Sequence, residues 1–144
     1  MRDTKRLERL IAVRERMLSV RRSELADASA ALVRAEEDKT RISSELVETV
    51  QALTTLGELL PEELALRATT VRAAAAGLKR AEGECAERAT QRTEHAARAF
   101  EAKRDVRVLE ELELRISSVE QRDGARREQA STDETAATRA TRRA

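Results

Sequence analysis

Apolar residues recur along the first half of the chain in alternating steps of four and three residues. Starting at Leu7 and ending at Leu60, this repeat covers sixteen positions, of which twelve are apolar. A seven-residue repeat of this length is typical of a coiled-coil seam, because it keeps one stripe of a helix turned toward a partner. The pattern therefore predicts one long helix. The polar exceptions are Arg14, Arg21, Lys39 and Thr49.

The same steps continue through the second half with more interruptions. Many of the apolar positions there are alanines, which bury little area each, so we expect the middle of the seam to be loosely held. Leu112 and Val119 fall outside the repeat and predict a shift of its phase near the C-terminus. The apolar repeat positions are Val71, Ala74, Leu78, Ala81, Cys85, Ala99, Ala102, Val106, Leu109 and Ile116, and the polar ones are Arg88, Arg92, His95 and Glu113.

The two halves meet at TLGELLPEELAL, residues 55–66, which contains the one proline of the chain. Two interpretations are open: a bend between two helices, or a local fault in one continuous helix. Gly57 stands where a helix would stop, and Pro61 followed by two glutamates favours the first turn of a new helix. In the middle of a helix the proline would cost about 3 kcal/mol. Local chemistry therefore predicts helices over about residues 3–57 and 61–138, joined by a turn at 57–61.

The distribution of charge favours a hairpin. Residues 1–22 carry eight basic and three acidic side chains, whereas residues 23–66 carry three and ten. Residues 67–107 carry ten basic and six acidic side chains, and residues 100–121 carry four and six. Folding the chain near residue 60 therefore places blocks of opposite charge along each other, which selects register and orientation. A parallel homodimer would instead place like charges together.

Composition favours long helices or a coiled coil and argues against a rounded core. Charged residues make up 38% of the 144 residues and aromatics 1%, which suits long helices. No apolar run is long enough to span a membrane, and the N-terminus lacks the apolar core of a signal peptide. We therefore predict an all-α, soluble, cytoplasmic protein in which residues 1–144 form a single long antiparallel two-helix coiled-coil hairpin. Because the second helix is longer, roughly the last 24 residues form a C-terminal helix overhang that extends past Met1.

Residue patterns for catalysis or cofactor binding are missing from the sequence. The four glycines do not cluster into a phosphate-binding loop, and Cys85 and His95 are ten residues apart, a spacing that does not place two metal ligands on one helix face. We therefore expect no enzymatic activity, no cofactor and no metal. The basic N-terminal end could attract phosphate, but stacking aromatics are lacking, so nucleic acid is not an expected partner. Direct membrane insertion is not expected either.

Two segments of the chain carry a resemblance to a known family. The N-terminal KRLERLIAVRERMLSVRRSELADA, residues 5–28, resembles the opening of FliJ proteins, the stalk and general chaperone component of flagellar type III export. The C-terminal KRDVRVLEELELRISSVEQRDGARREQASTDETAATR, residues 103–139, is similar to the closing segment of that family, where LE-x-L leads to EQ-x-x-x-DE. The related YscO-type stalks of injectisomes share this architecture. The matching positions are Leu109, Glu110, Leu112, Glu128, Gln129, Asp133 and Glu134.

The resemblance implies a non-enzymatic central stalk of a type III export apparatus, flagellar or injectisome, peripheral to the export gate at the inner membrane. Its implied partners are the hexameric export ATPase, which receives the terminal end, the cytoplasmic domain of the export gate, and export chaperones. The alternative is a generic coiled-coil scaffold or tether that forms an oligomer. The residues assigned to the ATPase-facing end can equally be solubilising helix surface. They are Arg6, Arg9, Arg14, Arg16, Glu128, Gln129, Asp133 and Glu134.

Overall fold

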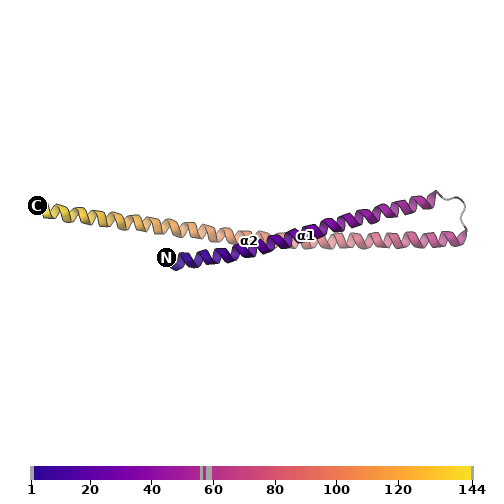
Figure 1. Cartoon of the computed structure of the whole chain (residues 1–144), viewed down its shortest axis with the longest axis horizontal. Helices are drawn as coiled ribbons and strands as arrows, with labels where there is room; N and C mark the ends of the chain where they lie inside the picture. The colour runs from indigo at the N-terminus through magenta and orange to yellow at the C-terminus, as the bar shows by residue number, and fades with distance from the viewer. Residues whose placement is uncertain (1, 56, 58–59, 144) are drawn as a thin grey trace. The chain divides into compact units, whose positions relative to one another are not determined.

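The structure is a computed structural model that describes residues 2–55, 57 and 60–143. Helix α1 spans Arg2–Thr54 and helix α2 spans Pro61–Arg143 (Figure 1). These two long helices pack against each other, and the described residues include no strand. α1 ends before the predicted boundary at residue 57, and α2 continues beyond the predicted end at residue 138. Neither helix, as far as it is described, contains an apolar stretch of membrane-spanning length.

The start of α2 follows from the proline and the residues around it. The carbonyl of Leu60 accepts hydrogen bonds from the amides of Glu63 at 3.0 Å and Leu64 at 3.1 Å, which closes the first turn. Pro61 is the first helical residue, a position where no amide hydrogen is needed and where the fixed φ angle suits a helix. Glu62 and Glu63 add negative charge to the first turn, which the helix dipole favours. The helix thus begins at the residue that the sequence indicates.

The helices are divided into two units, each described by itself. The terminal unit contains residues 1–18 and 101–144, and the inner unit contains residues 19–100. Among the side chains that the structure describes in the terminal unit, the buried ones are aliphatic and come from both helices: Leu7, Ile11 and Leu18 from α1, and Val106 from α2. In the inner unit the described buried side chains are all alanines. These are Ala35, Ala81 and Ala99.

The predicted repeat agrees with the burial of side chains on α1. Of its fifteen described positions from Leu7 to Leu60, thirteen are buried or partly buried. The exceptions are Lys39, which is exposed, and Leu60, which is 69% exposed and lies outside both helices. The repeat position at Leu56 lies outside the described residues.

On α2 the repeat also agrees with burial, with two corrections. All ten apolar repeat positions from Val71 to Ile116 are buried or partly buried. Arg92 is exposed, and its neighbour Gln91 is partly buried instead. The predicted shift of phase is wrong, because Leu112 and Val119 are 44% and 54% exposed while Ile116 remains partly buried. Leu112 and Val119 lie beside the seam, and the phase of the repeat is unchanged through residue 116.

Candidate partner-binding surfaces

The arginines predicted at the ATPase-facing end lie on α1 in the terminal unit. Arg6, Arg9 and Arg16 are exposed because they fall between the positions of the repeat. Arg14 occupies a repeat position and is partly buried, and its Nη1 lies 3.4 Å from Oδ2 of Asp105 on α2. The two side chains keep 41% and 54% of their surface exposed, so this ion pair contributes at most about 1 kcal/mol. Arg14 thus contacts α2, whereas the other three arginines point into solvent.

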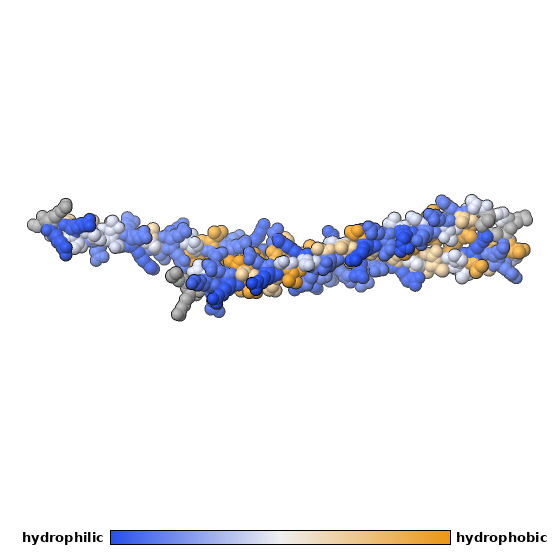
Figure 2. Space-filling view, in the orientation of Figure 1, coloured by the Kyte–Doolittle hydropathy of each residue, from blue (hydrophilic) through white to orange (hydrophobic). Residues whose placement is uncertain are grey.

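The remaining predicted positions lie on the last part of α2. Glu128, Gln129, Asp133 and Glu134 are all exposed. We call residues 118–142 the C-terminal segment; within it, every described residue except Gly124 is exposed. Figure 2 shows a mainly hydrophilic surface along this segment. The segment is therefore a helix whose side chains are available to a partner.

The structure does not bring the two predicted groups together. The Arg14–Asp105 contact shows that these two residues lie at the same height along the two helices of the terminal unit. From Asp105 to Glu128 the rise of α2 is roughly 35 Å, whereas from Arg14 back to Arg2 the rise of α1 is roughly 18 Å. Glu128 therefore lies beyond the start of α1, as Figure 1 shows for the C-terminal part of α2. The arginines and the C-terminal positions form two separate surfaces.

Threonines in the C-terminal segment satisfy their hydroxyl groups within their own helix. Thr132, Thr135, Thr138 and Thr141 donate to the carbonyl oxygens four residues earlier, at 2.8, 2.7, 2.7 and 3.0 Å. Such bonds satisfy the donor but slightly weaken the helix, because the hydroxyl competes for backbone acceptors. The polar groups that remain for a partner in this segment are mainly its charged side chains.

An apolar surface that the sequence pattern did not predict lies beside the seam of the terminal unit. It consists of large side chains that are between 43% and 57% exposed. On α1, two of its members lie seven residues apart and each precedes a seam position, a spacing that could have revealed them. Figure 2 shows apolar surface where α1 and α2 both contribute to this unit. We call it the apolar face, and its residues are Leu10, Val13, Met17, Val108 and Leu112.

A polar contact interrupts the seam of the inner unit. Oε2 of Glu24 accepts a hydrogen bond from Arg21 Nη1 at 2.9 Å and lies 3.7 Å from Nδ1 of His95. The hydrogen bond from Arg21 is the main cause that holds the pKa of Glu24 below its ordinary value of 4.5, and the charges of His95 and Arg98 act in the same direction. The His95 side chain is 28% exposed. Its position agrees with the expected polar interruption of the seam.

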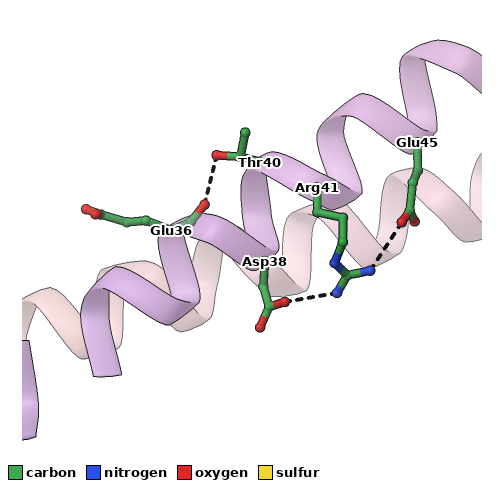
Figure 3. Close-up of polar contacts among 5 residues, drawn as sticks. All are labelled: Glu36, Asp38, Thr40, Arg41 and Glu45. Atoms are coloured by element: carbon green, nitrogen blue, oxygen red, sulfur yellow. Dashed lines mark hydrogen bonds and ion pairs between the residues drawn. The ribbon is translucent and has the colours of Figure 1, made fainter. Parts of the chain in front are cut away.

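Residues 36–38 of α1 are three consecutive acidic residues, and the last of them, Asp38, forms an ion pair with Arg41 of its own helix. Arg41 Nη2 lies 2.9 Å from Asp38 Oδ1, and Arg41 Nη1 lies 3.2 Å from Glu45 Oε1 (Figure 3). Hydrogen bonds with these carboxylates raise the pKa of Arg41. The Thr40 hydroxyl donates to the Glu36 carbonyl at 2.8 Å. All of these side chains are exposed, so the run is a solvated helix face with local ion pairs.

Cys85 is a partly buried free thiol at a repeat position. Among the described residues, no group of three or more His, Cys, Asp or Glu side chains is arranged to hold a metal ion.

In comparisons with known proteins, no family model, no curated protein and no solved structure matches this chain. Its function must therefore be inferred from its own residues and surfaces.

Proposed function

We propose that this chain is a non-enzymatic central stalk of a type III export apparatus, flagellar or injectisome. Its terminal end inserts into the hexameric export ATPase, and the chain couples that ATPase to the export gate and takes part in export-chaperone handling. The observation that most supports this is the C-terminal segment, which remains helical although almost all of its side chains are exposed. The resemblance of residues 5–28 and 103–139 to FliJ-type stalks suggests that the export ATPase receives the C-terminal segment.

The finer architecture in this proposal is an antiparallel two-helix coiled-coil hairpin with a C-terminal overhang. Within the inner unit, Glu24 of α1 lies beside His95 of α2, and Arg92 Nε donates to the Ser29 hydroxyl at 3.3 Å. Later residues of α1 therefore meet earlier residues of α2. Continued along the seam, this register places Ala35 opposite Cys85. In an antiparallel coiled coil, the repeat positions of one helix must face the repeat positions of the other in this way.

The charge of the C-terminal segment suits contact with a ring that moves around it. Residues 118–142 contain five basic and five acidic side chains, so the segment is highly charged but has no net charge. Each exposed ion pair with a partner would contribute at most about 1 kcal/mol, so such contacts can form and break readily. A hydrated, charged helix can therefore slide within a pore, whereas a broad apolar surface would hold it in one position.

Hydrolysis and hexamer formation by a cognate export ATPase test the proposal. The full chain should raise both, because it promotes assembly of the ring. A variant carrying Glu128→Arg, Asp133→Arg and Glu134→Arg should require about tenfold more protein for the same stimulation, which corresponds to about 1.4 kcal/mol of binding. The matched control is Glu36→Arg, Glu37→Arg and Glu48→Arg, which reverses three exposed acidic residues of the inner unit. If the full chain changes neither hydrolysis nor ring assembly, the export proposal is wrong.

A coiled-coil scaffold that forms an oligomer is the second candidate, because a seven-residue repeat that pairs two helices of one chain can also pair helices of different chains. The two functions differ in which helices pair, because a stalk pairs α1 with α2 of the same chain. Ala35→Cys should form an intramolecular disulfide with the native Cys85 on oxidation, since the proposed register brings the two Cβ atoms together. Glu36→Cys is the control, because residue 36 is exposed and off the seam. A disulfide that forms only between chains would favour the scaffold.

A further inference from the structure

The seam line of α2 continues past the part that α1 covers. Stepping back from Val71 by four, three and four residues gives Arg67, Leu64 and Leu60, which follow one side of the helix. Val71 and Arg67 are partly buried, whereas Leu64 is 54% and Leu60 is 69% exposed. All of residues 60–66 are exposed. Two leucines at the beginning of α2 therefore occupy seam positions that α1 leaves open.

The lengths of the two helices explain this open stretch. Glu24 lies beside His95, so equal steps along both helices in the register proposed above place Thr54 opposite residue 65. α1 ends at Thr54, and the leucines lie beyond that level. Figure 2 shows apolar atoms at the end of the inner unit where α2 begins. We call this surface the leucine end, and its residues are Leu60, Glu62, Glu63 and Leu64.

The charge around the leucine end is of one sign. Residues 42–66 contain five acidic side chains and no basic one. One of the five, Glu45, forms an ion pair within α1, whereas Glu62 and Glu63 are exposed beside the two leucines. The next basic residue along α2, Arg67, is partly buried. The leucine end is therefore an apolar surface with an acidic border.

This combination restricts what can bind. Carboxylates repel the phosphates of nucleic acid and of anionic lipid headgroups, and the same end of a second copy carries the same negative charge. An apolar surface with an acidic border is complemented by apolar side chains that lie between Lys or Arg residues. Because the two leucines continue a seam that a helix covers elsewhere, the complementary shape is also a helix.

We propose that the leucine end binds a basic amphipathic helix of another protein. That helix covers Leu60 and Leu64 with its apolar side and places Lys or Arg side chains beside Glu62 and Glu63. Stable interfaces bury on the order of 800 Å² on each partner, and this end is smaller, so we expect a dissociation constant in the micromolar range. The inference goes beyond the export role and does not depend on it, because it uses neither the C-terminal segment nor an ATPase.

Titration of the full chain with a synthetic helix tests the proposal. The probe is an amphipathic peptide of Leu and Lys, about five helical turns long, with one Trp. Its fluorescence reports binding without background, because the chain contains no Trp or Tyr. A Leu–Glu peptide of the same pattern and a Lys–Ser peptide should bind at least about tenfold more weakly. If the wild type binds no peptide, or all three equally, or binds anionic lipid vesicles instead, the proposal is wrong.

Removal of the leucines locates the site. Leu60→Ser with Leu64→Ser should weaken binding of the Leu–Lys peptide about tenfold, since it removes the apolar contact. Serine is well tolerated before the first turn of a helix, so α2 should still begin at Pro61. The matched control is Leu112→Ser with Leu114→Ser, two leucines of the terminal unit that are 44% and 70% exposed. An equal loss in both variants would overturn the proposal.

Removal of the charges tests the acidic border. Glu62→Gln with Glu63→Gln should weaken binding of the Leu–Lys peptide about fivefold at low salt and less at high salt, because salt screens exposed charges. The control is Glu36→Gln with Glu37→Gln, which removes two consecutive exposed carboxylates elsewhere in the inner unit. Circular dichroism should show equal helix content for both variants. Equal weakening by both would mean that the peptide binds any acidic helix surface, and the leucine end would not be a specific site.

Discussion

The terminal and inner units use the same seven-residue repeat, but they bury different side chains in it. Of the described residues, those buried in the terminal unit are Leu7, Ile11, Leu18 and Val106, whereas those buried in the inner unit are alanines. Burying a leucine or isoleucine contributes about 2–3 kcal/mol, and an alanine methyl contributes far less. Each buried seam position of the terminal unit therefore contributes more to holding the helices together than a buried alanine of the inner unit.

The inner unit also has more polar groups at its seam. Arg21, Arg88 and His95 occupy repeat positions and are partly buried, and Glu24 lies beside His95. Polar residues at seam positions lower stability but help to define register, because their partners are available in one alignment only. At the buried positions the terminal unit therefore relies on aliphatic side chains and the inner unit on alanines, while the inner unit adds partly buried polar residues to its partly buried leucines.

Truncation at the seam should show the largest difference. Leu18→Ala should lower the free energy of unfolding by about 2–3 kcal/mol, at the low end for buried leucines, because the seam of two helices has no enclosed core. Ala81→Gly should lower it by about 1 kcal/mol, chiefly through helix propensity. Urea denaturation followed by circular dichroism measures both. Equal losses of the free energy of unfolding would show that the seam residues of the two units contribute equally to stability.

Replacing glycine with alanine should distinguish a paired from an unpaired stretch of helix. Neither Gly83 nor Gly124 has an atom within 4 Å of an added Cβ, so alanine fits at both. Gly83→Ala should raise the free energy of unfolding by about 1 kcal/mol, because it favours a helix that packs in the inner unit. Gly124→Ala should raise the helical signal and leave the main unfolding midpoint unchanged, because the C-terminal segment is exposed. A similar shift of the midpoint by both variants would mean that this segment unfolds together with the seam.

The smallest effect should come from the carboxylate beside His95. The pKa of Glu24 is lowered from 4.5 in the folded chain, so its ionised form contributes stability above that pH. This contribution is lost as the pH falls through the folded-state pKa below 4.5. Glu24→Gln should therefore lower the melting temperature slightly at pH 7, and the difference from wild type should close in acid. The matched control is Glu48→Gln, which replaces an exposed glutamate of the same helix.

Most of the fold follows from local patterns in the sequence. The seven-residue spacing identified the buried stripe on both helices, and Pro61 with the glutamates after it identified the start of α2. The predicted shift of phase is wrong for a physical reason. It rests on Leu112 and Val119 being apolar, yet both are exposed. Hydrophobicity alone does not distinguish a seam residue from one beside it, since the position of the second helix decides which is covered.

The candidate surfaces were predicted less completely than the fold. The C-terminal positions Glu128 and Asp133 are exposed, and the structure separates them from Arg6 and Arg9. The apolar face was missed altogether. It consists of residues from two helices that are about 100 positions apart in the chain, and their proximity depends on how α1 and α2 pair in the terminal unit.

The sequence by itself determined that the chain forms two long helices, where the second begins, and which stripe of each is apolar. Those properties depend on backbone geometry and on spacing within one segment, which neighbouring residues specify. Only the tertiary structure decided that Arg14 meets Asp105, that Glu24 lies beside His95, and that Leu10 and Val108 share a groove. The reason is that contacts between helices depend on register and on the side that each helix presents, and several alignments satisfy the same repeat until all side chains are placed together.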